Sequence, residues 1–275
     1  MRSLFVLILA AATAANPQPP VPSPATASNA SWSLVWSDEF NGPANTPPDP
    51  AKWVYDLGHS TDGWGNHELE AYTNSLDNVR QDGQGHLVIR AIKDDKGDYT
   101  SARIKTLGKF ATQYGKIEVR MKIPQGQGVW PAFWAMGADI EKIGWPNCGE
   151  IDIMENIGKE PSIVHGTVHA PGYYGDKGPS GSYTLPAGQK LADDFRVYGM
   201  VWTSDSIEFE FDGHPYFKVP ASSIPAGTKW IFNKPFFLLL NLAIGGDWPG
   251  SPNSSTVFPS EMIVDYVRVY KKGAK

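Results

Sequence analysis

Strict alternation of apolar and polar side chains is the feature that most constrains what this chain can fold into. The segment 116–123 reads KIEVRMKI, so its apolar residues face one way and its charged residues the other. The segment 207–211 (IEFEF) alternates in the same way, and Asp212-Gly213 then predicts a hairpin turn into a strand at 214–219. A two-residue period indicates β-strands with one buried face.

Other segments extend this pattern along the chain. We expect further strands at 87–93, 197–203 and 263–271. The segment 236–244 (FFLLLNLAI) is apolar on both sides, which predicts a central strand buried on both faces. Long amphipathic helical stretches are absent from the sequence. The chain is therefore predicted to be all-β, with two packed antiparallel sheets in a β-sandwich or jelly roll.

Composition narrows the class of protein. The 275 residues carry a formal net charge of −5 and no basic block, which argues against binding to nucleic acid or to an anionic membrane. Ten Trp residues could stack on sugars, although core packing is the alternative for each of them. The single cysteine, Cys148, cannot form an internal disulfide and is predicted to be a small buried filler. We expect a monomer.

The N-terminus has the pattern of a signal peptide. Met1-Arg2 precedes an apolar run at 4–12, and small residues follow, which predicts cleavage near Ala14 or Ala15. A membrane anchor is the alternative, but the run is shorter than the roughly 20 residues that span a bilayer. Residues 16–31 are rich in Pro, Ser and Ala and predict a linker. We expect a secreted protein, extracellular or periplasmic, with one domain at 32–275.

Three carboxylates lie close together in the segment 147–158, which reads NCGEIDIMENIG. In a regular strand Glu150 and Asp152 share a face, whereas Glu155 points the other way, into the core. An unpaired carboxylate in the core is costly. A β-bulge near Ile153-Met154 would return Glu155 to the face of the other two acids.

Three acids on one face point to glycoside hydrolysis. Their mutual repulsion should separate their pKa values, so that one carboxylate can attack a sugar while another donates a proton to the leaving oxygen. Asp152 could hydrogen-bond to one of the glutamates and help to set its protonation state. A solvated acidic strand and a cation site are the alternatives.

Several motifs occur in a characteristic order. They are VWSDEFN at 35–41, GNHELEAY at 65–72, GVWPAFW at 128–134, GWPNCGEIDIME at 144–155, NLAIGGDWPG at 241–250 and VDYVRVY at 264–270. In these motifs the chain resembles glycoside hydrolase family 16, and within it the laminarinase-type endo-β-1,3-glucanases. The resemblance implies a concanavalin A-like jelly roll of two curved antiparallel sheets with a concave substrate cleft.

The resemblance also implies a mechanism. Glu150 would be the nucleophile, Glu155 the general acid/base and Asp152 the assistant of the nucleophile, with retention of anomeric configuration and no catalytic cofactor. Lichenase-type and xyloglucan-active relatives carry E-I-D-x-E, one residue shorter, whereas Met154 lengthens the motif here as in laminarinases. The resemblance implies cleavage of β-1,3-glucan, with mixed β-1,3/1,4-glucan as the open alternative.

Two other classes resemble the same family. Agarases and carrageenases share the longer acidic motif, but a sulfated galactan calls for cationic subsites, of which the acidic net charge gives no hint. Non-catalytic β-glucan-binding proteins lack the glutamates, and both Glu150 and Glu155 are present here. A β-glucan polysaccharide is therefore the expected substrate and partner.

Aromatic residues near the acidic motif are candidates for substrate binding. Trp145 lies five residues before Glu150, where its indole could stack on a sugar or pack at the rim of the cleft. Trp130 and Trp134 are four apart in a predicted strand and should face alike, toward the cleft or the core.

Polar residues complete the predicted site. His165 and His169 are a weak hint of zinc, and the resemblance instead places His169 near the acid/base Glu155, where it could tune that proton. The resemblance implies that Asn66 binds substrate. Asn241 lies in an apolar strand and must find a partner, either backbone or sugar, and Arg103 could donate to sugar hydroxyls.

A structural calcium ion is implied by the resemblance, away from the cleft. Its ligands would be the backbone of Glu39, the backbone of Gly85 and the carboxylate of Asp265. Because Asp265 lies between apolar neighbours in a predicted strand, its charge needs a partner. A salt bridge with a Lys or Arg is the alternative.

Overall fold

The computed structural model describes residues 31–273 of the chain. The predicted signal peptide and all but the last residue of the predicted linker lie outside the described residues. Within 31–273, no helix combines the length and the apolar character that crossing a membrane would require.

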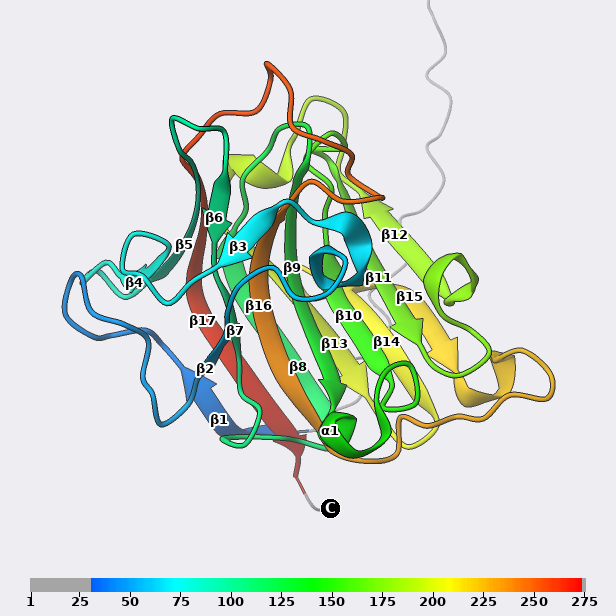
Figure 1. Cartoon of the computed structure of the whole chain (residues 1–275). Helices are drawn as coiled ribbons and strands as arrows, with labels where there is room; N and C mark the ends of the chain where they lie inside the picture. The colour runs from blue at the N-terminus through cyan, green and yellow to red at the C-terminus, as the bar shows by residue number, and fades with distance from the viewer. Residues whose placement is uncertain (1–30, 274–275) are drawn as a thin grey trace, which may run out of the picture. The chain divides into compact units, whose positions relative to one another are not determined.

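Two sheets make up the molecule (Figure 1). The larger has the order β15-β14-β13-β8-β17-β5-β6-β3, with β1 also paired to β17 and β4 to β5. The smaller has the order β12-β11-β10-β9-β16-β7-β2. The strands of the larger sheet are β1 (Trp32–Asp38), β3 (Glu70–Tyr72), β4 (Val79–Gln81), β5 (Leu87–Lys93), β6 (Tyr99–Ser101), β8 (Gly115–Lys122), β13 (Arg196–Trp202), β14 (Ser206–Phe211), β15 (His214–Pro220) and β17 (Ser260–Lys272). Those of the smaller are β2 (Val54–Asp56), β7 (Arg103–Lys105), β9 (Val129–Gly137), β10 (Glu150–Glu155), β11 (Ile163–His169), β12 (Ser180–Thr184) and β16 (Phe236–Ile244).

The predicted strands are confirmed. In β8 every second residue is buried, as the alternation requires, and in β16 all nine residues are buried. The β14–β15 hairpin turns at Asp212 and Gly213, both with positive φ, as a tight two-residue turn demands. One detail differs from the expected antiparallel sheets, because β3 and β6 pair in parallel.

Helical structure is sparse among residues 31–273. The only α-helix described there is α1 (Ile140–Ile143), and a π-helical turn, η1, covers Gly63–His67. The remaining helical pieces in this part of the chain are 3-10 turns of three residues each, at Gly175–Lys177, Leu191–Asp193 and Ala221–Ser223. The prediction of an all-β fold is confirmed.

The core lies between the two sheets. Phe133 and Leu240 of the smaller sheet belong to one buried cluster with Val119 and Phe209 of the larger. Figure 1 shows β16, β9 and β10 curving across the front of β8, β13 and β14. This is a jelly-roll β-sandwich, and it leaves the second face of the smaller sheet available for a site.

Cys148 is part of the packing between β9 and β16. Its side chain is buried beside Met136 and Leu239. Burial raises the pKa of its thiol to about 11, so a thiolate is disfavoured. The prediction of a small buried filler is confirmed.

Candidate active site

A β-bulge in β10 decides which way the acidic side chains face. Between Asp152 and Met154, β10 carries one more residue than the facing part of β9. The cross-strand partners on β9 are Met136 for Glu150, Trp134 for Asp152 and Ala132 for Glu155. All three partners line the same cavity, so the bulge brings the three acids to one face. The predicted bulge is confirmed.

The cavity over this face measures about 290 Å³. Nine predicted residues line it, namely Asn66, Arg103, Trp130, Trp134, Trp145, Glu150, Asp152, Glu155 and Asn241. Six others were not predicted, namely Ser60, Trp64, Gly65, Glu68, Ala132 and Met136. The alternation of β9 could have identified Ala132 and Met136, because both lie an even number of residues from Trp134.

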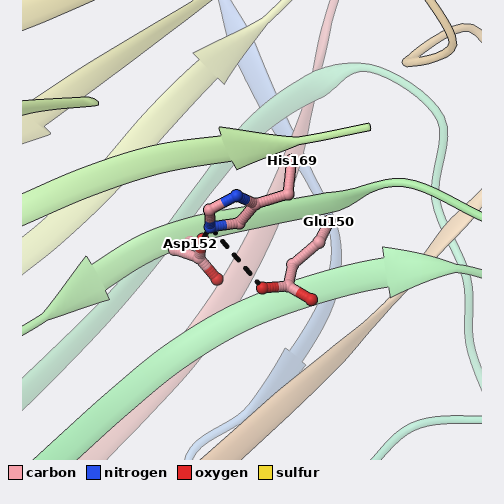
Figure 2. A group of neighbouring side chains, drawn as sticks. All are labelled: Glu150, Asp152 and His169. Carbon is pink, nitrogen blue, oxygen red and sulfur yellow. Dashed lines mark ion pairs between the residues drawn. The ribbon is translucent and has the colours of Figure 1, made fainter. Parts of the chain in front are cut away.

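His169 lies beside the first two acids (Figure 2). It is the cross-strand partner of Glu150 on β11. Its Nε2 is 3.1 Å from Asp152 Oδ2 and 3.9 Å from Glu150 Oε1. The expected neighbour was Glu155, whereas the contacts are with Asp152 and Glu150. A positive charge on His169 nevertheless lowers the pKa of Glu155, against the larger effect of burial.

Burial raises the pKa of all three acids. It raises the pKa of Glu150 to about 8, with a further rise from the charge of Asp152 and a counteracting pull from His169. It also raises the pKa of Asp152 to about 7 and that of Glu155 well above its usual range. The predicted separation into one low and one high pKa is therefore incomplete, because all three groups lose water. A protonated Glu155 fits the role of an acid.

Trp130 and His165 flank the third acid. The Trp130 indole donates a hydrogen bond to Glu155, Nε1 to Oε1, at 3.1 Å. His165 is the cross-strand partner of Glu155, and its Nε2 lies 3.5 Å from Glu160 Oε2. The two histidines do not share one site, because each faces carboxylates of its own. His165 lies beside Glu160, whereas the possible ligand atoms of His169, Glu150 and Asp152 all lie within 4.8 Å of one another. Trp130 fixes the position of Glu155.

Hydrogen bonds join several residues of one cleft wall. Asn66 Nδ2 donates to Glu68 Oε1 at 3.0 Å, and the Tyr72 hydroxyl donates to Glu68 Oε2 at 3.0 Å. Asn241 Nδ2 donates to the Tyr72 hydroxyl at 3.1 Å, and the Trp134 indole donates to Asn241 Oδ1 at 2.7 Å. The side-chain amide of Asn241 thus pairs with two other side chains and not with backbone, and it also lines the cavity where a sugar would bind.

Arg103 builds the same wall. Its guanidinium lies between the rings of Trp64 and Trp134, 4.8 and 4.6 Å from their centroids, and its Nε is 3.0 Å from Asp56. Stacking and ion pairing therefore hold Arg103 in place. Trp64 was missed by sequence reasoning, although it stands two residues before Asn66 and directly precedes the motif at 65–72.

Aromatic rings stand at the rim of the cavity. Trp145 lines it with 46% of its surface exposed, and its ring meets Tyr174 edge to face at 5.3 Å. Trp130 meets Trp248 in the same way at 5.6 Å. Tyr174 and Trp248 are themselves exposed and were not predicted. Large exposed rings beside a cavity suit contact with the faces of sugars.

One of the three expected calcium ligands, the Asp265 carboxylate, is engaged with another partner. Asp265 Oδ2 forms an ion pair with Arg120, which was the alternative considered for it. At Glu39 the expected ligand was the backbone, whereas its carboxylate accepts two hydrogen bonds from Arg268, at 3.0 and 2.8 Å. Gly85 has a positive φ in a turn. A cation at Asp265 would have to displace a guanidinium, so the set as it stands fits calcium only in part.

Comparison with known proteins agrees with this architecture. The family model for glycosyl hydrolases family 16 matches residues 66–268. The chain is 41% identical to a beta-glucanase from Rhodothermus marinus, covering 87% of this chain and 85% of that protein. It is 40% identical to glucan endo-1,3-beta-glucosidase A1 from Niallia circulans over 88% of this chain, and it spans only 38% of that longer protein. Among solved structures, an endo-beta-1,3-glucanase from Pyrococcus furiosus superposes with a TM-score of 0.84 at 45% identity, covering 90% of this chain and 97% of that one.

Proposed function

Because this chain belongs to glycosyl hydrolase family 16, we propose that it is a retaining endo-β-1,3-glucanase. The observation that carries the proposal is the bulge of β10, which gathers Glu150, Asp152 and Glu155 on the cleft face. Similarity to glucanases from several organisms supports the choice of substrate.

The first step forms a covalent glycosyl-enzyme. The ionised Glu150 attacks the anomeric carbon while Glu155 donates its proton to the glycosidic oxygen, whose bond to that carbon breaks. Burial favours the protonated acid at Glu155 before the reaction. Trp130, which donates to Glu155, holds this carboxyl against the leaving oxygen.

The second step releases the sugar. Glu155, now ionised, takes a proton from water, the water oxygen bonds to the anomeric carbon, and Glu150 leaves as a carboxylate. Two inversions give overall retention. His169 lies beside Glu150, and a positive charge there lowers the pKa of Glu150, which favours the ionised nucleophile against the larger effects of burial and of Asp152.

The shape and lining of the cleft suit a neutral polysaccharide. Trp130, Trp134 and Trp145 offer rings for stacking. Among residues 31–273, Arg103 is the only arginine that lines the cavity, and it is already paired with Asp56. A sulfated galactan would need free cations there. Laminarin-like β-1,3-glucan is therefore the proposed substrate, with mixed β-1,3/1,4-glucan as a second one.

Side-by-side product analysis on laminarin, lichenan, agarose and carrageenan tests the substrate. We expect oligosaccharides from laminarin, fewer from lichenan, and none from the two galactans. Release from a galactan alone would overturn the proposal.

The Glu150→Gln and Glu155→Gln variants test the catalytic roles. Each should lose at least about 10³-fold in kcat while still binding laminarin, because Gln keeps the size of the side chain but neither attacks nor donates a proton as Glu does. A glucan-binding protein without catalysis would show binding in the unaltered chain and no reducing-sugar release. Unchanged hydrolysis in Glu150→Gln would contradict the mechanism.

Export and assembly form a further part of the proposal. We propose that the protein is secreted as a monomer after cleavage near Ala14 or Ala15, on the strength of the N-terminal pattern. N-terminal sequencing of the mature protein and light scattering in solution test both points. An intact N-terminus starting at Met1, or a dimeric mass, would contradict them.

Calcium binding by Glu39, Gly85 and Asp265 is proposed as a stabilising feature only. Carbonyl and carboxylate oxygens are the ligands that calcium prefers, and the ion would replace Arg120 at Asp265. Thermal unfolding with calcium and with a chelator tests the proposal, with Asp265→Asn as the control. A rise in Tm that calcium gives to the unaltered chain and not to Asp265→Asn would support it, whereas equal Tm values would contradict it.

A further inference from the structure

Glu68 occupies a central place in the cleft wall although the proposed mechanism does not use it. It stands between η1 and β3, forms a bridge with Gly245 after β16, and is 8% exposed at the edge of the cavity. Both of its carboxyl oxygens accept hydrogen bonds, one from Asn66 and one from Tyr72. An ionised carboxylate satisfies two donors in this way.

The two hydrogen bonds extend to groups at the cavity surface. Asn66 itself lines the cavity. Tyr72 is buried, and its hydroxyl also accepts a hydrogen bond from Asn241 Nδ2. The amide oxygen of Asn241 accepts in turn from the Trp134 indole. The Glu68 carboxyl thus fixes the orientation of the Asn66 amide directly. It fixes the Asn241 amide and the Trp134 indole through the buried Tyr72 hydroxyl.

The direction of each bond depends on Glu68 being an acceptor at both oxygens. If the Tyr72 hydroxyl donates to Glu68, its oxygen is free to accept from Asn241 Nδ2. Asn241 then presents its oxygen to Trp134, which can only donate. If Glu68 instead donated to the Tyr72 hydroxyl, the buried Tyr72 O–H would lose its acceptor, and an unsatisfied buried polar group is destabilising.

From this chain of bonds we infer that Glu68 is a positioning residue for substrate binding, which holds Asn66, Asn241 and Trp134 in the orientations that meet the sugar. The inference rests on the proposed function. Glu68 acts through its neighbours and is not a catalytic residue, so its loss should weaken binding more than chemistry.

Glu70 offers a matched control for Glu68. It is fully buried two residues away, and its Oε2 accepts a hydrogen bond from the backbone of Ile244 at 2.7 Å. Burial and the neighbouring Glu68 raise the pKa of Glu70 well above its usual range, which favours the neutral acid. Glutamine at position 70 therefore resembles the neutral form of Glu70. At position 68, glutamine replaces one of the two accepting oxygens with an amide NH₂ donor.

Steady-state kinetics on laminarin test the inference. Glu68→Gln should raise KM about tenfold, the effect of losing one hydrogen bond to a charged group, and lower kcat less than about threefold. Glu70→Gln should leave KM and kcat within about twofold of the unaltered chain. An unchanged KM in Glu68→Gln, or an equal rise in Glu70→Gln, would overturn the inference.

A double-mutant cycle gives a second and independent test. Tyr72→Phe removes the hydroxyl that links Glu68 to Asn241, so its effect on KM should not add to that of Glu68→Gln. Additive effects would contradict the linkage. If Glu68→Gln fails to fold, as a Tm measurement will reveal, Tyr72→Phe alone must raise KM with kcat largely kept, and an unchanged KM would overturn the inference.

The outcomes also separate this inference from the proposed function. If the unaltered chain does not hydrolyse laminarin, the proposed function fails. If it does and Glu68→Gln has normal KM, only the role of Glu68 fails.

Discussion

At the scale of single residues, the site combines groups that sequence reasoning found with groups that it missed. The acids and Trp145 were found because side-chain type and spacing reveal them. Glu68 and Trp64 were missed because their roles depend on hydrogen bonds and stacking between segments far apart in the chain, such as β3 and β16. Sequence spacing does not reveal residues whose roles come from contacts between distant segments of the chain.

Glu155→Gln should change how stability depends on pH. The folded protein raises the pKa of Glu155 above its ordinary value of 4.5, so folding takes up a proton and stability is lost as pH rises through the folded pKa. Gln is neutral at every pH. We expect Glu155→Gln to be more stable than the unaltered chain at pH 8 and nearly equal to it below pH 4.5.

Denaturant unfolding at several pH values measures this difference. Glu208→Gln serves as the control, because Glu208 lies outside the cleft and pairs with Lys218 at the surface. A Glu155→Gln variant that is less stable than the unaltered chain at pH 8 would show that the carboxylate is not strained by burial.

Trp145→Ala should weaken substrate binding with little effect on chemistry. The exposed ring contacts Tyr174 and lies along the cavity, so its removal takes away stacking area without opening the core. We expect KM on laminarin to rise about tenfold, corresponding to about 1.4 kcal/mol, with kcat within about threefold. Val257→Ala, at an exposed loop position, serves as the control. An unchanged KM in Trp145→Ala would mean that Trp145 is only rim packing.

At the scale of the elements, alternation predicted the strands well because one buried face leaves a clear sequence pattern. β8 and the β14–β15 hairpin match their predictions within one residue at each end. The short strands β2, β3 and β6 were not predicted, because three residues carry too little pattern. The bulge of β10 was predicted only because a regular strand would have buried Glu155.

The bulge allows a prediction about chain length in β10. Deletion of Met154 leaves E-I-D-I-E, in which regular alternation keeps all three acids on one face with Glu155 still opposite Ala132. Insertion of one Ala between Met154 and Glu155 turns Glu155 toward the core. The insertion should therefore lower kcat at least about 10³-fold, whereas the deletion should retain much more activity.

Reducing-sugar assays on both length variants, with Tm values as a check on folding, decide the matter. The deletion also removes a buried Met side chain, so a loss of about 2–5 kcal/mol in stability is expected. Equal activity in the folded deletion and insertion variants would mean that the facing of Glu155 does not control catalysis.

At the scale of the whole molecule, the packing of the two sheets holds in place the smaller sheet, whose outer face forms the cleft. The smaller sheet turns one face to the core and the other to the cavity, so β9 carries Phe133 on one face and Trp134 on the other. Fold class and sheet packing were predictable from periodicity. The pairing of β16 with both β9 and β7, which brings Asn241 and Arg103 to the same wall, was not, because strand order leaves no local pattern.

Leu240→Ala tests whether the core face of the smaller sheet affects stability without affecting catalysis in the cleft. Leu240 is fully buried in the core cluster, so its truncation should lower the free energy of unfolding by about 2–5 kcal/mol. KM and kcat measured well below the new Tm should stay within about twofold. A large loss of activity with normal stability would imply that the core face shapes the cleft directly.

The central claim is that Glu150 forms a covalent bond with the sugar while Glu155 transfers protons. The most direct measurement is mass spectrometry of the chain after reaction with a 2-deoxy-2-fluoro β-1,3-glucosyl substrate that carries an activated leaving group, which forms the glycosyl-enzyme but slows its hydrolysis. We predict one added glycosyl unit, located by peptide fragmentation on Glu150, and none in Glu150→Gln. A label on Glu155 or Asp152, or continued laminarin hydrolysis by Glu150→Gln, would contradict the account.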